Sequence, residues 1–134
     1  MKVNEFMGVR LEFVDHEDSV YDAVEKMVDL RIRWVIVKFP GEETDFGIIT
    51  QRDVVYKVLT QDINPKKIKA FEIASRPIMW IDKDTDSRDA GKMMEKSNIA
   101  RLVVCDNGRI IGSISMLDVM TAELVAIARG DYDS

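Results

Sequence analysis

The sequence contains one pattern twice, at a constant offset. An offset of 67 positions places seven residues of the first half on identical residues of the second: Glu5, Asp15, Asp22, Ala23, Met27, Ile32 and Val37 on Glu72, Asp82, Asp89, Ala90, Met94, Ile99 and Val104. After a loop that is two residues longer in the first copy, an offset of 65 aligns five more: Gly47, Ile49, Asp53, Val54 and Leu59 on Gly112, Ile114, Asp118, Val119 and Leu124. A constant register with matching apolar spacing indicates an internal duplication.

Each copy shows the same order of expected elements. An extended segment, 10–14 or 78–81, precedes a helix whose apolar residues recur at helical spacing. Two β-rich runs follow, 34–39 and 46–50 in the first copy and 102–105 and 110–115 in the second, and a helix closes each copy at about 53–60 and 118–129. The loop 40–45 joins the first pair of runs, and Asn107-Gly108, the strongest short hairpin signal, joins the second.

These elements predict an α+β (mixed α/β) fold of two pseudo-twofold-related β-α-β-β-α repeats. We expect the repeats to span 1–62 and 63–134. One such unit buries little apolar surface by itself, so the two are expected to pack as one compact module.

Composition excludes several classes of protein. The 134 residues are 46% hydrophobic and 32% charged, with no apolar run long enough to cross a bilayer and no secretory signal at the N-terminus. The net charge of -5 makes nucleic-acid binding an unfavoured role. The single cysteine, Cys105, and single histidine, His16, form no metal-ligand pattern, and a lone cysteine suits a cytoplasmic setting.

One motif recurs where the second β-run of each copy ends. At 47–53 and 112–118 a run ends in a hydroxyl residue, and an acid follows three positions later. Thr50 and Ser115 suit helix N-caps, and the positive helix end favours an acid at the third position. The same geometry suits a ligand, because helix-start N–H groups attract phosphate and a carboxylate accepts two hydrogen bonds from a vicinal diol. Either motif alone leaves capping and binding equally open.

The duplicated unit and the two motifs resemble the CBS domain, which occurs in tandem pairs called Bateman modules. The family pattern, Gly-apolar-apolar-Ser/Thr-x-x-Asp-apolar, corresponds to 47–54 and 112–119, and the resemblance extends over about 3–124. It implies that AMP, ADP, ATP or sometimes S-adenosylmethionine binds in the crevice between the copies. It implies neither a catalytic residue nor a cofactor or metal.

The resemblance also implies which residues bind. Asp53 and Asp118 would hold the ribose hydroxyls, and Thr50 and Ser115 would contact ribose or phosphate. The base would lie against the extended segment of the opposite copy: Ser75, Arg76, Pro77 and Ile78 for the Asp53 site, and Gly8, Val9, Arg10 and Leu11 for the Asp118 site. The further expected contacts, with the arginines as phosphate ligands, are Ile32, Arg33, Gln51, Arg52, Ile99, Ala100, Arg101 and Met116.

The two motifs differ in charge. Gln51 and Arg52 stand in the first where Met116 and Leu117 stand in the second. We therefore expect the Asp53 site to prefer a phosphorylated ligand, and the Asp118 site to be weaker or to accept a less charged nucleoside.

The sequence thus favours an adenine-nucleotide sensor that changes conformation or partner binding when a ligand binds. Two alternatives remain: a nucleotide-independent dimerisation or interaction module, and a sensor of an S-adenosylmethionine-type ligand. An enzyme is disfavoured, because the chain shows no base–nucleophile pair, metal cluster or Walker-type loop. Partners are expected to include a second copy of the chain and an unidentified protein. The apolar residues of the last helix suit the dimer: Leu117, Val119, Met120, Leu124, Val125 and Ile127.

Overall fold

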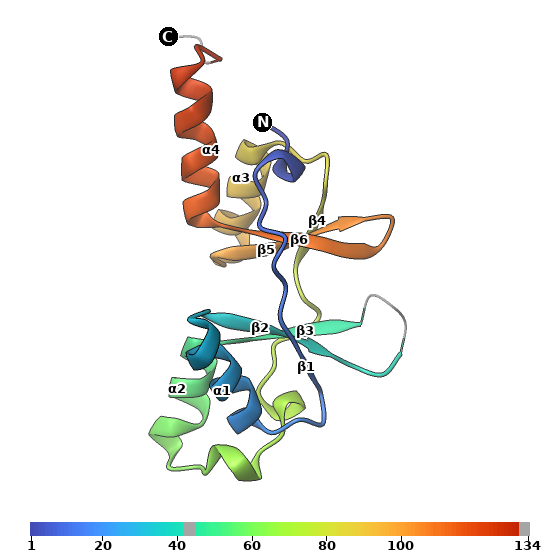
Figure 1. Ribbon diagram of the computed structural model, residues 1–134, viewed down its shortest axis with the longest axis vertical. Helices are drawn as coiled ribbons and strands as arrows, with labels where there is room; N and C mark the ends of the chain where they lie inside the picture. The colour runs from blue at the N-terminus through green and yellow to red at the C-terminus, as the bar shows by residue number, and fades with distance from the viewer. Residues whose placement is uncertain (42–44, 132–134) are drawn as a thin grey trace. The chain divides into compact units, whose positions relative to one another are not determined.

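The computed structural model describes residues 1–41 and 45–131, which form two compact units. The first-repeat unit is Leu11–Ile78, and the second-repeat unit combines Met1–Arg10 with the residues from Met79 onward. Each contains a three-stranded sheet and two α-helices (Figure 1). The predicted α+β class and the duplication of one unit are confirmed.

The first-repeat unit has one sheet of order β1-β2-β3. β1 pairs parallel with β2, and β2 pairs antiparallel with β3. Its elements are β1 (Phe13–Asp15), α1 (Val20–Leu30), β2 (Trp34–Lys38), β3 (Phe46–Thr50), α2 (Gln51–Lys57) and the 3₁₀ turns η2 (Leu59–Gln61), η3 (Pro65–Lys67) and η4 (Ala70–Glu72). Part of the loop that joins β2 to β3, residues 42–44, lies outside the described residues.

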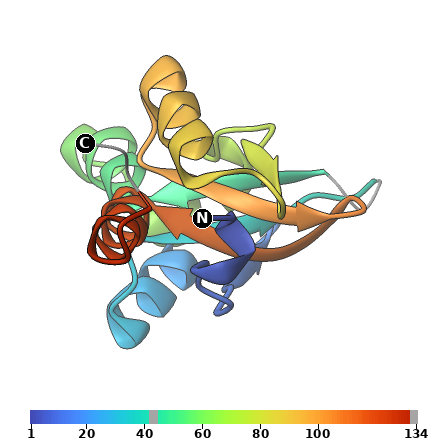
Figure 2. The ribbon, with the colours of Figure 1, turned by 90° about the horizontal axis from the view of Figure 1, so that it is seen from above.

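The second-repeat unit has the same topology, with a sheet of order β4-β5-β6. Its elements are η1 (Val3–Glu5), β4 (Trp80–Asp82), α3 (Ser87–Ser97), β5 (Arg101–Asp106), β6 (Arg109–Ser115) and α4 (Met116–Ala128). Asn107 and Gly108 have φ of 51° and 79°, the positive values that a type I′ hairpin turn requires. Figure 2 shows this turn at the opposite end of the sheet from the start of α4.

The repeated apolar residues form the two cores. In the first-repeat unit Ala23 and Met27 of α1 pack on Val37 of β2 and Ile49 of β3. Their counterparts in the second-repeat unit occupy the same places: Ala90, Met94, Val104 and Ile114. The helical spacing of these residues on α1 and α3 reflects one buried face on each helix.

The last helix of each unit begins two residues before the expected start. α2 begins at Gln51 and α4 at Met116, whereas the apolar pattern indicated starts near Asp53 and Asp118. The capping interpretation of the motif gave the correct start, because Thr50 and Ser115 are the N-caps and each acid is the third helical residue.

Each unit takes in the segment that precedes the other repeat in the chain. Val3 is fully buried in the core of the second-repeat unit, and Ala70 is fully buried in that of the first. Asn4 N–H donates to the Lys83 carbonyl, just as Phe71 N–H donates to the His16 carbonyl. The compact units therefore differ from the expected repeats 1–62 and 63–134. Residues 1–10 belong to the second-repeat unit, and residues 63–78 belong to the first-repeat unit.

In the part of the chain that the structure describes, every helix is too short or too polar to cross a bilayer.

Candidate functional site

The first candidate site is the junction of β3 and α2. Asp53 Oδ2 accepts hydrogen bonds from the Thr50 backbone N–H at 2.9 Å and from Thr50 Oγ1 at 3.1 Å. The Asp53 N–H donates in return to Thr50 Oγ1 at 3.2 Å. The residues therefore form a reciprocal capping box, in which the second carboxylate oxygen, Oδ1, takes no part.

A lysine occupies that second oxygen. Lys57 Nζ lies 3.2 Å from Asp53 Oδ1, one helical turn along α2, and donates to the Ile73 carbonyl at 2.9 Å. The Asp53 side chain is only 14% exposed, whereas Lys57 is 46% exposed. Lys57 therefore ties the carboxylate to the segment that follows η4. The sequence interpretation missed Lys57, although its i+4 spacing from Asp53 is a signal of such a pair.

The second candidate site, at the junction of β6 and α4, has the same capping box without the lysine. Ser115 N–H donates to Asp118 Oδ2 at 2.8 Å, and Asp118 N–H donates to Ser115 Oγ at 3.2 Å. The position equivalent to Lys57 holds Ala122, which is buried. Asp118 Oδ1 is therefore not engaged by a cation in the described part of the chain.

The glycine that opens each motif, Gly47 or Gly112, lets an extended segment run beside the strand that leads to the junction. Ser75 and Ile48 exchange backbone hydrogen bonds of 2.9 Å, and so do Gly8 and Ser113. A Cβ on Gly47 would lie 2.9 Å from the Ser75 carbonyl oxygen, and one on Gly112 would lie 2.7 Å from that of Gly8. The motif glycine is thus required by the close approach of the neighbouring backbone.

The structure brings several expected ligand-binding residues to each junction. Gln51 N–H donates to the Arg33 carbonyl and Met116 N–H to the Ala100 carbonyl, at 2.9 and 3.1 Å. These bonds hold the residues before the central strand, which include Ile32 and Ile99, beside the start of α2 or α4. Arg33 is exposed there, and Arg52 is exposed with its guanidinium carbon 5.6 Å from the Tyr56 ring centre.

Other expected residues lie farther from the carboxylates. Ile78 N–H donates to the Phe46 carbonyl, at the end of β3 remote from Thr50, and the Ile78 side chain is buried. The Arg76 side chain turns to Asp45, with Nη2 and Oδ1 2.6 Å apart. Pro77 lies between them and is exposed.

In the second-repeat unit, Val9 is 74% exposed and Arg10 and Arg101 are engaged by other groups. Leu11, the last of the four residues that were expected to line the Asp118 site, is the first residue of the first-repeat unit. The roles of all these residues at a nucleotide stay predictions.

Each candidate site holds a single carboxylate in its capping box. Within residues 1–41 and 45–131, no three histidine, cysteine, aspartate or glutamate side chains cluster as a metal site. Each junction instead holds a carboxylate, which is a hydrogen-bond acceptor, beside a helix start.

Comparison with known proteins gives a family and a fold. A family model described as the CBS domain matches residues 3–60 and again residues 70–125. An uncharacterised protein of Methanopyrus kandleri is 38% identical over 112 residues, which are 83% of this chain and 57% of that protein. The chain thus spans little more than half the length of this relative.

Two solved structures carry the same fold. A putative signal-transduction protein with CBS domains from Burkholderia ambifaria superposes with a TM-score of 0.84 at 26% identity, over 93% of this chain and 95% of that chain. A CBS domain protein from Pyrobaculum aerophilum, complexed with AMP, superposes with a TM-score of 0.79 at 17% identity, over 94% of this chain and 99% of that chain. These descriptions name signalling or domain proteins and no enzyme.

Proposed function

Since this chain belongs to the CBS-domain family and carries two copies of the domain, we propose that it is a regulatory module that senses an adenine nucleotide and catalyses no reaction. Each ribose would be held by the carboxylate at one junction, Asp53 or Asp118. The ligand is AMP, ADP or ATP, and its binding would change the conformation of the module or its affinity for a partner protein.

One observation carries this proposal. In both units the capping box uses Oδ2 of the acid and not Oδ1. Helix capping by itself therefore leaves half of each carboxylate outside its hydrogen bonds, with lone pairs for a ribose diol. The AMP complex of the Pyrobaculum protein, which has the same fold, supports the choice of ligand.

Titration calorimetry on single-site variants tests the proposal. Asp53→Asn and Asp118→Asn retain a side-chain oxygen for the cap but lose the carboxylate, so the folded state should persist. With protein at about 100 μM, we expect AMP, ADP or ATP to bind the parent chain. Each single variant should lose one class of site, and the double variant should bind none.

The alternative is a nucleotide-independent dimerisation module. It would be supported if the double variant bound nucleotide as the parent does, or if no nucleotide bound to either protein. S-adenosylmethionine should be titrated as well. If it binds and AMP, ADP and ATP do not, the protein recognises the adenosyl group and not phosphate.

We also propose that two copies associate through α4. Four large apolar residues recur along that helix at spacings of three and four, and all are more than half exposed: Leu117, Met120, Leu124 and Ile127. An apolar stripe of this kind suits a helix partner. Val119 of the expected set instead packs against the unit's own core.

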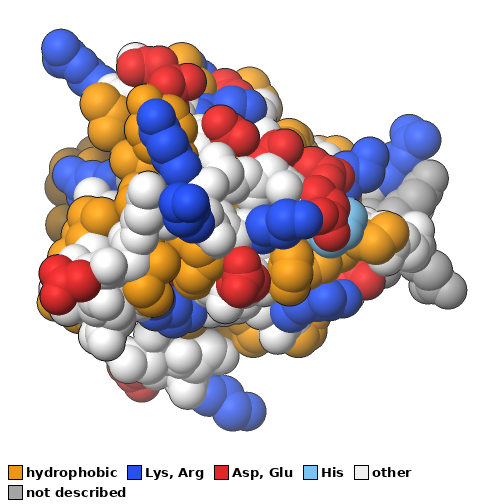
Figure 3. Space-filling model, turned by 90° about the horizontal axis from the view of Figure 1, so that it is seen from below, with side chains coloured by type: hydrophobic (Ala, Val, Ile, Leu, Met, Phe, Trp, Pro, Cys, Tyr) orange, Lys and Arg blue, Asp and Glu red, His pale blue; other side chains and the backbone are white. Residues whose placement is uncertain are grey.

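Nucleic acid is an unfavoured partner. The net charge is -5, and acidic and basic side chains alternate on the face in Figure 3. The cytoplasmic location stays a prediction.

A further inference from the structure

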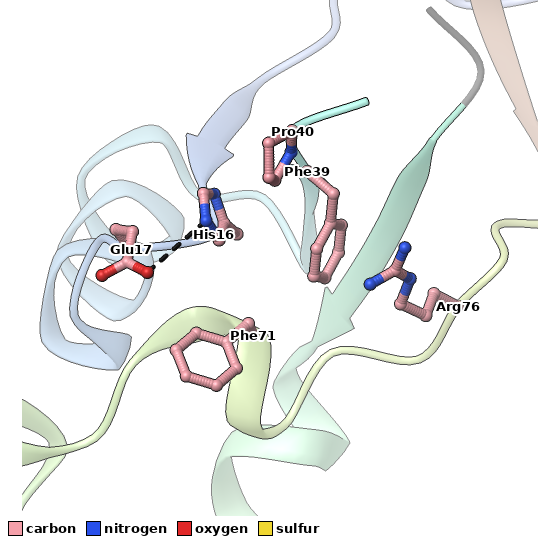
Figure 4. A pocket seen from close by; sticks show the side chains of 6 residues that line it. All are labelled: His16, Glu17, Phe39, Pro40, Phe71 and Arg76. Carbon is pink, nitrogen blue, oxygen red and sulfur yellow. Dashed lines mark ion pairs between the residues drawn. The ribbon is translucent and has the colours of Figure 1, made fainter. Parts of the chain in front are cut away.

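The first-repeat unit has a second concavity, at the end of its sheet remote from Thr50. It measures about 260 Å³ and lies where β1 and β2 end, beside η4 (Figure 4). Its lining is His16, Glu17, Phe39, Pro40, Phe71 and Arg76. None of these side chains belongs to the capping boxes at Asp53 and Asp118.

Three rings form the centre of the concavity. The His16 ring centre lies 5.8 Å from that of Phe39 and 6.4 Å from that of Phe71. Phe39 is buried, whereas Phe71 is 45% exposed and forms an open aromatic wall. A planar ring is the shape that such a wall accommodates by stacking.

The fold itself does not require these rings, because the second-repeat unit builds the same backbone without them. His16 N–H donates to the Lys38 carbonyl as Lys83 N–H donates to the Cys105 carbonyl. At the places of His16, Phe39, Phe71 and Arg76 the second unit has Lys83, Asp106, Asn4 and Val9. There Lys83 and Asp106 form an ion pair, with Nζ and Oδ2 3.6 Å apart. The aromatic lining is therefore specific to the first unit.

Opposite charges flank the rings. Figure 4 shows Glu17 and Arg76 on opposite sides of the cluster. The Arg76 guanidinium carbon lies 3.9 Å from the Phe39 ring centre, and its Nη2 is paired with Asp45, which leaves other N–H groups to donate. A hydrogen bond from Lys69 to Oε2 and the charge of Lys69 lower the pKa of Glu17, so that its carboxylate is ionised near pH 7.

We propose that this concavity binds a free aromatic α-amino acid, with the ring on Phe71 and His16, the carboxylate on Arg76 and the ammonium group on Glu17. Arg76 pairs with Asp45 and Lys69 with Glu17, and Asp15 lies 3.3 Å from the His16 ring. The rim therefore carries no excess positive charge and favours a zwitterion over a polyanion such as a nucleotide. The module would then sense a second class of metabolite, and this inference does not depend on nucleotide binding.

Amide-detected NMR titration of the full chain with L-tryptophan and L-phenylalanine tests the proposal. We expect at least one amino acid to shift the signals of residues around Phe71 at up to about 10 mM. Phe71→Asn installs the residue found in the second unit and should weaken binding by about tenfold or more. Glu17→Gln, at an exposed position, should weaken it as well. Tyr21→Asn alters another exposed aromatic residue of the same unit and should leave binding within about twofold.

Two analogues of tryptophan, each without one of its charged groups, test whether the site recognises both charges of the amino acid. Tryptamine lacks the carboxylate and indole-3-propionate lacks the ammonium group, so each should bind more weakly than L-tryptophan. The Asp53→Asn, Asp118→Asn double variant should bind the amino acid normally, which separates this site from the nucleotide sites. The proposal is overturned if neither amino acid binds, if Phe71→Asn binds undiminished, or if tryptamine equals L-tryptophan.

Discussion

At the scale of single residues, the two candidate carboxylates differ in one neighbour. Asp53 and Asp118 sit in the same capping box, but Lys57 pairs with the first and buried Ala122 takes its place beside the second. On the proposed function, a ribose diol at Asp53 would have to share Oδ1 with the lysine, whereas among the described residues no lysine competes for Oδ1 of Asp118. Arg52 is expected to favour a phosphorylated ligand at the Asp53 site, whereas the pairing of Lys57 with Asp53 should weaken ribose binding at the same site.

Lys57→Met, in an Asp118→Asn background, should separate the effect of Lys57 on ribose binding from its effect on phosphate binding. Adenosine should bind the Asp53 site about two- to fivefold more tightly, which corresponds to the roughly 0.4–1 kcal/mol of a half-exposed ion pair. ADP should gain less, because its phosphates lose a nearby positive charge. Calorimetry with both ligands gives the ratio.

Lys92→Met removes a more exposed lysine that pairs with Asp89 and is the matched control, with no expected change. A loss of adenosine affinity in Lys57→Met would contradict the prediction and make Lys57 a donor to the ligand.

Cys105 provides a prediction about pH and reactivity. Burial, and to a lesser degree the negative charge of Asp82, raises the pKa of its thiol above that of an exposed cysteine. The folded state therefore holds the proton more tightly than the unfolded chain. The neutral thiol contributes to the free energy of unfolding in full at any pH below the pKa that it has in the unfolded chain. This contribution is lost as the pH rises through the higher pKa that it has in the folded state.

A thiol-alkylating reagent at pH 8 should modify native Cys105 at least about a hundredfold more slowly than the urea-unfolded chain, because the buried group reacts only after opening. Mass spectrometry follows the reaction. Equal rates would show that the side chain is accessible in the native state.

At the scale of elements, the position of each extended segment depends on a glycine in the neighbouring strand. The backbone of Gly8 passes so close to β6 that a Cβ on Gly112 would lie 2.7 Å from its carbonyl oxygen and 2.6 Å from Met7 Sδ. The methionine side chain can move, but the hydrogen-bonded backbone cannot move without losing its bonds to Ser113.

Gly112→Ala should therefore lower the free energy of unfolding by about 1–3 kcal/mol, the usual cost of overpacking. Gly91→Ala is the matched control, since its Cβ would meet only Val119 Cγ1 at an ordinary 3.7 Å within α3. That change should raise stability by up to about 1 kcal/mol, because alanine favours the helix. Urea unfolding measures both, and equal effects would contradict the close-approach argument.

At the scale of the whole molecule, the apolar stripe of α4 has no cover within its own unit. Leu124 lies in its middle and is 67% exposed, and Val28 on α1 is 68% exposed without such a stripe. Substitutions at these two equally exposed positions therefore show whether self-association depends on the α4 stripe or on any exposed apolar side chain.

Leu124→Glu should weaken self-association by about tenfold or more, because the dimer would bury an unpaired charge. Val28→Glu should leave it unchanged. Sedimentation equilibrium gives the association constants, and thermal melts check that both variants fold. Equal association in the two variants would exclude the α4 face as the interface.

The repeat, its element order and the capping residues were predictable, because each depends on residues close together in the chain. Thr50 and Asp53 form their box over three residues, and the helical spacing of Ala23 and Met27 marks the buried face of α1. Methionine was less predictable: Met27 and Met94 are core residues, but Met116 and Met120 are more than half exposed. The same side chain suits both settings.

From the sequence alone it follows that one β-α-β-β-α unit occurs twice and that each copy carries an acid at a capped helix start. What surrounds those acids depends on how distant segments of the chain pack. In the folded chain Lys57 lies between Asp53 and the Ile73 carbonyl, and the Gly8 backbone lies against Gly112. The rings of His16, Phe39 and Phe71 come together from three separate parts of the chain. These contacts could not be predicted because caps and helical stripes are local, whereas such neighbours meet only when distant segments pack.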